Sequence, residues 1–215
     1  MAGSWREQRK AGIAAIAAAL VIAAALWLAI RFLMPPLDGM ESLSGRMLFA
    51  LKCCCVGVLF CLVTGVEAVA HERLQSAAFD PLQHHRTRRL EVNSRYLQNT
   101  LEQIVVFAAG LFGLAAYSVG GDGMRSVLAT TVVWILSRFA FWIGYHRSAA
   151  MRGLGAPGMM AGLLMLLYVV GRIGDDVAGT PGAAAALVAY LLFEALLFRA
   201  TRAAASTAPD QGGDD

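Results

Sequence analysis

The sequence has 215 residues, of which 58% are hydrophobic and 15% are charged, and its formal net charge is +3. A soluble domain carries about 25% charged residues, so this composition excludes an ordinary soluble protein and predicts a chain solvated mainly by lipid. The small net charge, without Lys/Arg clusters interleaved with aromatic residues, also argues against nucleic acid as a partner. We therefore expect one compact membrane bundle surrounded by lipids.

Six runs of the sequence are apolar enough to cross or nearly cross a bilayer, which takes about 20 residues. They are residues 11–34, 47–70, 97–119, 127–145, 159–173 and 183–198. The first run follows a basic stretch, as a signal peptide does, but it is longer than a typical signal core. No small-residue cleavage site follows it before Pro35, so we predict an uncleaved span. The last run contains the charged residue Glu194. Whether this run spans the membrane is therefore judged from the charges of the segments that connect the runs.

Basic residues gather in alternate connections, which predicts the orientation of the spans. The four basic segments hold Arg6, Arg9 and Lys10; Arg73, Arg86, Arg88, Arg89 and Arg95; Arg147 and Arg152; and Arg199 and Arg202. With six spans, all four segments lie on the same side of the membrane. This agreement supports the sixth span and predicts that both termini are cytoplasmic.

Two connections differ in kind. The Gly-rich segment 120–123 predicts a tight turn, which makes the third and fourth spans adjacent antiparallel helices. Residues 71–94 form a long polar connection that suits a lid or a partner surface. His84 and His85 in this connection lack partners at fixed spacing, so we expect no metal site there.

The four cysteines, Cys53, Cys54, Cys55 and Cys61, all lie in the second span. Three consecutive helical residues point in directions about 100° apart, so they do not converge on one ion. Their spacing fits neither a metal site nor a disulfide framework. We expect them to act as small apolar filler between helices, with redox or lipidation chemistry as the alternative.

The third span carries an ionisable stripe. Arg95, Asn99 and Glu102 are spaced i, i+4 and i+7, so they lie on one helix face. A charge at this depth costs at least about 2.5 kcal/mol unless it is paired or faces a wet cavity. The stripe therefore predicts either a binding site or a polar contact that holds helices together.

The fourth span offers a partner for this stripe. Arg138 and Tyr145 are again spaced i and i+7, with Phe141 between them. In antiparallel helices Glu102 and Arg138 lie at similar depth, so we predict a buried ion pair between them, with Asn99 in the same network. Near the membrane surface, Arg95, Tyr145 and Arg152 have snorkelling as an alternative role. Together these groups predict a cytoplasm-facing cleft for a small polyanion.

The two stripes resemble those of the MAPEG family, the membrane-associated proteins in eicosanoid and glutathione metabolism. Arg95, Asn99 and Glu102 match its Arg-x-x-x-Asn-x-x-Glu pattern, and Arg138, Tyr145 and Arg152 match its later Arg, Tyr and Arg. Residues 145–152 are similar to leukotriene-C synthase, and residues 99–103 to bacterial members of the family. The resemblance covers residues 46–173.

The resemblance implies an all-α membrane bundle, a homotrimer, and glutathione bound as co-substrate between neighbouring subunits. Five residues would hold the tripeptide: Arg95, Asn99, Glu102, Arg138 and Tyr145. Arg152 and Tyr145 would be catalytic, because a cation or a hydroxyl beside the sulfur favours the nucleophilic thiolate. The implied function is a glutathione-dependent transferase or peroxidase that acts on a lipophilic small molecule, in a bacterial inner membrane.

The sequence departs from the family pattern at two positions. Leu97 stands where transferases often have Gln or His, and Phe141 stands where Tyr or His is seen. Both changes remove donors and favour the alternative function, a non-catalytic lipid-binding scaffold of the same family.

The resemblance also divides the chain. We expect an N-terminal segment with an extra span and linker at 1–45, a four-helix domain at 46–173, an additional apolar helix at 174–200, and a disordered tail at 201–215.

Overall fold

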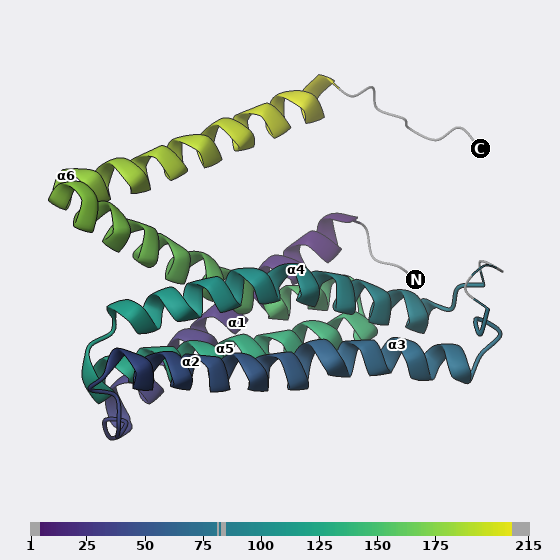
Figure 1. Ribbon diagram of the computed structural model, residues 1–215. Coiled ribbons are helices and arrows are strands. Elements are labelled where there is room, and N and C mark those ends of the chain that lie inside the picture. The colour runs from purple at the N-terminus through teal and green to yellow at the C-terminus, as the bar shows by residue number, and fades with distance from the viewer. Residues whose placement is uncertain (1–4, 81, 83–84, 208–215) are drawn as a thin grey trace. The chain divides into compact units, whose positions relative to one another are not determined.

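The computed structural model describes residues 5–80, 82 and 85–207, and the side chains of residues 7–80, 82 and 85–202. All regular structure in these residues is helical, which confirms the predicted all-α class (Figure 1). In chain order the elements are α1 (Trp5–Leu33), α2 (Leu43–Gly57), the π-helix η1 (Val58–Val63), α3 (Thr64–Leu74), α4 (Arg88–Tyr117), α5 (Gly120–Arg147), the 3₁₀-helix η3 (Ala150–Gly155) and α6 (Ala156–Thr207).

Five helical segments in the described part of the chain are long and apolar enough to cross a membrane. The second of them, Leu43–Leu74, is one continuous rod made of α2, η1 and α3, and it contains the predicted span 47–70. Ser42 begins this rod, because its Oγ accepts a hydrogen bond from the backbone N–H of Gly45 at 3.0 Å.

The fifth and sixth predicted spans lie on the two arms of α6. The helix breaks at Ala178 and Gly179, and Gly179 has a φ of +63°. Pro181 follows the break in the first turn of the second arm, where a proline is tolerated because its missing N–H would have no partner within the helix. Residues 167–215 form a compact unit separate from residues 1–166.

The predicted tail 201–215 begins as helix, since α6 continues to Thr207. Thr201 Oγ1 donates to the carbonyl of Leu197 at 2.6 Å, and the alanines at 203–205 are the strongest helix formers. Helix formation at 201–207 therefore corrects that prediction. The remaining residues, 208–215, lie outside the described part of the chain.

The core of residues 1–166 lies among α2, α4 and α5. The rings of Phe107 (α4) and Trp134 (α5) stack with centroids 4.3 Å apart. Gly57 faces both rings, and a Cβ on it would lie 3.2 Å from Phe107 Cε1 and 3.4 Å from Trp134 Cζ3. A small residue at this position lets the end of α2 approach the aromatic pair closely.

The turn between α4 and α5 lies two residues earlier than predicted. Ser118 and Val119 connect the helices, and α5 begins at Gly120, which has a φ of +64°. The rest of the predicted turn 120–123 forms the first helical turn, where Asp122 is favoured by the helix dipole. The two helices pack against each other as predicted for a tight connection.

The predicted long connection, 71–94, is shortened from both sides. The α3 helix continues to Leu74, and α4 begins at Arg88. Thr87 caps α4, since its Oγ1 accepts from the backbone N–H of Leu90 at 3.0 Å. The polar connection is therefore residues 75–87.

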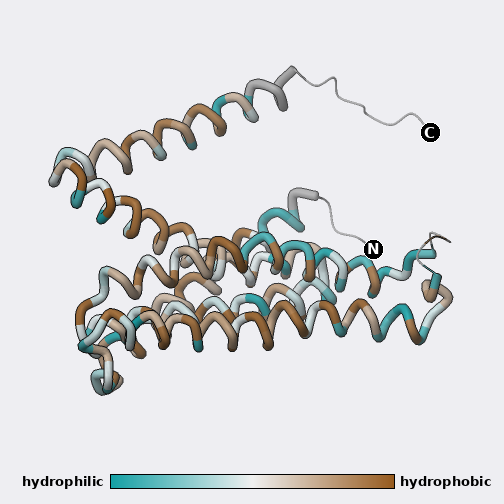
Figure 2. The backbone as a smooth tube through the Cα atoms, in the orientation of Figure 1, coloured by the Kyte–Doolittle hydropathy of each residue, from teal (hydrophilic) through white to brown (hydrophobic). Residues whose placement is uncertain are grey.

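The extra N-terminal helix packs against α5 and η3. Trp27 Nε1 donates to Thr130 Oγ1 at 3.0 Å, and Arg31 forms an ion pair with Asp122 at 3.3 Å. These two contacts fix α1 along the first half of α5. Hydrophobic residues run along the length of the helices, whereas hydrophilic residues gather on the first half of α4 (Figure 2).

All four cysteines are free thiols. Cys53, Cys54 and Cys61 are buried in the core, in agreement with the predicted filler role, whereas Cys55 is exposed on α2.

Candidate functional site

A cleft of about 570 Å³ lies along α4, α5, η3 and the start of α6. Its lining residues are Arg95, Gln98, Asn99, Glu102, Gln103, Arg138, Phe141, Tyr145, Arg152, Gly153, Gly155, Ala156 and Met159. All six residues that the sequence nominates for the site lie in this lining. Gln103 was missed, although it follows Glu102 directly and its amide faces the same cleft.

The α4 wall of the cleft is a ladder of polar side chains. Arg95 Nη1 donates to Gln98 Oε1 at 3.5 Å, and Gln98 Nε2 donates to Glu102 Oε1 at 3.2 Å. Gln103 Nε2 donates to Asn99 Oδ1 at 3.2 Å. Each bond joins residues three or four apart, which are neighbours on a helix surface. The spacing in the sequence therefore builds this wall locally.

Arg138 forms the floor of the cleft, and its side chain is 0% exposed. Its Nη1 donates to Asn99 Oδ1 at 2.9 Å, and its guanidinium carbon lies 4.8 Å from the centroid of the Phe141 ring. Its Nε and Nη2 are buried and have no hydrogen-bond partner in the described part of the chain. A buried guanidinium with two unbonded nitrogens is costly, so these nitrogens are candidate donors to an anion.

The predicted ion pair between Glu102 and Arg138 does not form within the chain. Glu102 is exposed and accepts from Gln98, while Arg138 bonds to Asn99. Three helical residues turn the chain by about 300°, so Asn99 and Glu102 point about 60° apart. Asn99 faces α5, and Glu102 faces the open side of the cleft.

Tyr145 and Arg152 lie at the far wall of the cleft. The Tyr145 ring packs on Phe141 with centroids 5.7 Å apart. Arg152 is exposed and lies on η3. Two glycines, one on α5 and one on η3, allow these two elements to pack closely. A Cβ on Gly144 would lie 2.3 Å from the Met151 carbonyl oxygen, and one on Gly155 would lie 2.4 Å from Phe141 Cβ.

The two departures from the family pattern have different surroundings. Leu97 is absent from the cleft lining and lies against α3, with its Cδ1 3.4 Å from where a Cβ on Gly65 would be. Phe141 does line the cleft, where its ring supports the Arg138 guanidinium. Only the change at Phe141 therefore alters the donor set of this cleft.

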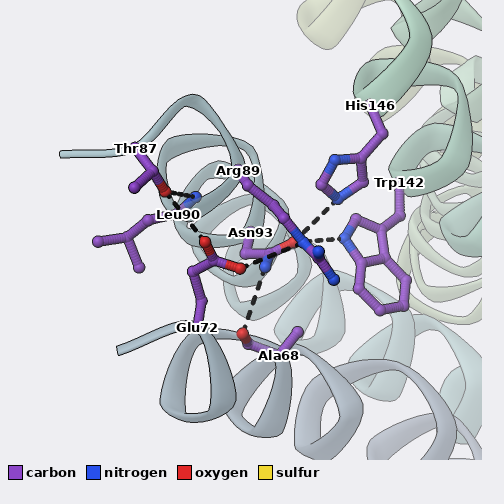
Figure 3. Close-up of polar contacts among 8 residues, drawn as sticks. All are labelled: Ala68, Glu72, Thr87, Arg89, Leu90, Asn93, Trp142 and His146. Carbon is purple, nitrogen blue, oxygen red and sulfur yellow. Dashed lines mark hydrogen bonds and ion pairs between the residues drawn. The ribbon is translucent and has the colours of Figure 1, made fainter. Parts of the chain in front are cut away.

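A second polar cluster, which the sequence reasoning missed, ties α3, α4 and α5 together (Figure 3). Asn93 Oδ1 contacts Trp142 Nε1 at 2.9 Å and His146 Nε2 at 3.0 Å. Asn93 Nδ2 donates to the carbonyl of Ala68 at 3.2 Å. The i, i+4 spacing of Trp142 and His146 is the one signal in the sequence for this contact. Both the oxygen and the nitrogen of the Asn93 side-chain amide are hydrogen-bonded, which fits a structural role.

The start of α4 and the end of α5 also meet in this region. Glu72 accepts from Thr87 Oγ1 at 3.1 Å and pairs with Arg89 Nε at 3.2 Å (Figure 3). Arg88 Nη1 donates to the carbonyl of His146 at 2.9 Å, which satisfies one of the last carbonyls of α5. These contacts fix the helix end that carries Tyr145.

Among the described residues, no group of three or more His, Cys, Asp or Glu side chains is arranged to hold a metal ion. His84, which belongs to the histidine pair considered above, lies outside the described residues.

A family model described as the MAPEG family matches residues 47–174, more than half of the chain. No curated protein and no solved structure matches the chain. The matched segment begins in α2 and ends in α6, and it contains the whole lining of the cleft.

Proposed function

This chain belongs to the MAPEG family, and we propose that it is a glutathione-dependent transferase or peroxidase that acts on lipophilic electrophiles. Its family and its long apolar helices make it an integral multi-pass membrane protein. The family also includes non-catalytic members, so the activity itself is the proposal. The observation that carries it is the buried Arg138 guanidinium, with two unused donors, in the floor of a polar cleft.

Glutathione has the charges that the cleft complements. The tripeptide carries two carboxylates, which suit the guanidinium groups of Arg95 and Arg138, because planar guanidinium groups bind carboxylates in a forked geometry. It also carries one ammonium, which suits the exposed carboxylate of Glu102. The Asn99 amide and the Tyr145 hydroxyl add hydrogen-bonding groups of the kind that the peptide needs.

The thiol would lie near Arg152 and Tyr145. A cation or a hydroxyl donor there stabilises the thiolate over the thiol. In a transfer reaction the thiolate sulfur bonds to an electrophilic carbon, and the displaced group leaves with the electron pair. In a peroxidase reaction a lipid hydroperoxide is reduced to an alcohol and water while two glutathione molecules are oxidised to the disulfide.

The lipophilic substrate would enter from the bilayer. Met159, Ala156 and Phe141 form the apolar part of the cleft lining, next to helices that cross the membrane. An apolar entrance beside a polar floor suits an electrophile dissolved in lipid.

The proposal includes a homotrimer with glutathione between neighbouring subunits. The α4 face beside the cleft presents Leu101 and Val105, which are 54% and 66% exposed in the single chain. A neighbouring copy packed on this face would close the open side of the cleft. Chemical cross-linking in native membranes tests this part, and a monomer as the largest species would contradict it.

The location is part of the same proposal. The alternation of basic connections supports both termini in the cytoplasm of a bacterial inner membrane. Accessibility labelling of single cysteines placed near each terminus, in intact cells and in broken cells, tests it.

The second candidate is a lipid-binding scaffold without catalysis. Phe141 favours it, because an aromatic ring replaces a donor at the centre of the cleft. In this case the polar stripes hold the helices together, and the apolar end of the cleft presents a lipid.

Calorimetric titration of the detergent-solubilised protein with glutathione separates the two candidates. We expect binding in the range from micromolar to millimolar, which Arg95→Ala abolishes. Arg147→Ala is the matched control, because Arg147 is exposed and does not line the cleft. If the protein fails to bind glutathione at millimolar concentration, the enzyme is excluded and the scaffold remains.

A further inference from the structure

A second, smaller hollow lies beside the polar end of α4. It has a volume of about 260 Å³, and it is lined by the end of α3, by Ala78, His85 and Arg86 of the connection, and by the first turns of α4. It shares only Arg95 and Gln98 with the cleft described above. We name it the arginine pocket after Arg73, Arg86 and Arg95 in its wall.

Arg73 is the residue in this pocket that lacks a partner. Its side chain is half-buried, and its Nε is buried without a hydrogen-bond acceptor. It forms no ion pair within the described ranges, 5–80, 82 and 85–207. A buried N–H left without an acceptor costs roughly 1–3 kcal/mol, and more when it is charged. The pocket therefore holds a donor without an acceptor among the residues that the structure describes.

The pocket has an excess of positive charge. Its one carboxylate, Glu91, lies 3.8 Å from Arg86, and both side chains are more than half exposed. Such an exposed pair is weak, so Arg86 keeps most of its donors. Arg95 donates only a long bond of 3.5 Å, to the neutral Gln98 amide. The nearby carboxylate of Glu72 is already bonded to Thr87 and Arg89.

The pocket lining also includes apolar residues. Ala78 and Leu90 line the pocket and are almost fully buried. These two residues bring apolar contact to one part of a lining that is otherwise polar or charged.

We propose that the arginine pocket binds a phosphate-type anion through Arg73, Arg86 and Arg95. A guanidinium presents planar, forked donors that match phosphate oxygens, and the Ser94 hydroxyl in the wall adds a further donor. The volume is several times the ~30 Å³ that one water occupies in the liquid, so a phosphate group fits.

Two sources supply this chemistry. The pocket lies where two membrane-crossing helices end, at Leu74 and Arg88. Headgroups of anionic phospholipids lie at that level, and clusters of arginine beside a span attract them. Free phosphate in the adjacent aqueous phase is the other source.

The experiment uses the full chain, purified without glutathione and reconstituted in two kinds of nanodisc. One contains phosphatidylcholine alone, and the other also contains phosphatidylglycerol. Native mass spectrometry after release from the nanodisc measures the lipid that stays bound. The melting temperature in the phosphatidylcholine nanodisc, with and without inorganic phosphate, measures binding of the free anion.

We expect Arg73→Gln to weaken binding of the preferred anion about tenfold, which corresponds to the loss of one charge-assisted contact. Arg86→Gln is a second variant with a similar effect, and its side chain is 70% exposed, so folding is preserved. Arg147→Gln, an exposed arginine outside the pocket, controls for the change in net charge and leaves binding unchanged.

Retained phosphatidylglycerol without a phosphate effect supports a lipid headgroup as the ligand. A phosphate-dependent rise in melting temperature without retained lipid supports the free anion. The proposal is overturned if neither probe binds, or if Arg73→Gln and Arg86→Gln bind as well as Arg147→Gln. Because glutathione is absent throughout, these outcomes are independent of whether the cleft binds it.

Discussion

Arg138 and Asn99 are joined by a hydrogen bond of 2.9 Å from the Nη1 of the arginine to the Oδ1 of the amide. It links the polar stripe of α4 to the one cation that α5 buries completely. The other two nitrogens of that guanidinium remain unbonded in the described chain. The amide therefore orients the arginine, and the two unbonded nitrogens are the donors that the proposed ligand would use.

Replacing Asn99 tests this relationship. Asn99→Ala leaves the Arg138 guanidinium without its acceptor, so we expect a loss of roughly 1–3 kcal/mol in the free energy of unfolding. Unfolding in mixed micelles, followed by circular dichroism, measures it. Glu102→Gln is the matched control, because Glu102 is exposed and bonds only to Gln98. An equal loss in both variants would show that the ion pair expected from the sequence forms after all.

Glu102→Gln has a different consequence for the ligand. The variant keeps the shape of the side chain but removes the charge that suits the ammonium of glutathione. We expect glutathione binding to weaken about tenfold or more, as for the loss of a charge-assisted hydrogen bond, while the protein stays folded. Calorimetry on folded protein checks this. Unchanged affinity would remove Glu102 from the site.

Arg152 is expected to act on the thiol more than on binding. Arg152→Gln should lower kcat by about tenfold or more while the KM for glutathione changes little, because a cation beside the sulfur raises the fraction of bound glutathione that is present as the nucleophilic thiolate. Arg152→Lys keeps a cation and should recover part of the rate. Steady-state kinetics with a model electrophile measures both constants. A rise in KM with unchanged kcat would assign Arg152 to binding alone.

Gly153 is one of the residues at which α1 contacts the segment that carries Arg152. A Cβ on Gly153 would lie 2.8 Å from Ile16 Cγ1 and 3.1 Å from the Gly12 carbonyl oxygen. Gly153→Leu should therefore push η3 away from α1, and overpacking of this kind costs roughly 1–3 kcal/mol.

Two measurements check the Gly153 prediction. Unfolding measures the stability, and trypsin cleavage after Arg152 reports the exposure of η3, which should increase. Gly12→Ala is the control, because its Cβ would lie 3.7 Å from the Ala150 carbonyl oxygen and 4.0 Å from the Ala150 Cα, both ordinary contacts. If Gly153→Leu is as stable and as resistant to trypsin as Gly12→Ala, then α1 does not restrain η3.

Local patterns in the sequence were sufficient for the helices and for six of the thirteen residues that line the cleft. The i, i+4 and i+7 spacing of Arg95, Asn99 and Glu102 sets one helix face whatever surrounds it, since each residue turns an α-helix by about 100°. The Thr87 cap and the Pro181 position are also local signals, but the sequence reasoning used neither. The predicted connection, 71–94, was therefore longer than the observed one, 75–87.

Only the tertiary structure decided which side chains meet across helices. Whether Arg138 bonds to Asn99 or to Glu102 depends on the relative rotation of α4 and α5. Aromatic packing, such as that of Phe107 on Trp134, accompanies that rotation. The contact of Asn93 with Trp142 and the docking of α1 on α5 through Trp27 depend on the same packing. Residues far apart in the sequence carry no mutual spacing rule, so the partner that a buried polar group finds is set by the geometry of the packed helices.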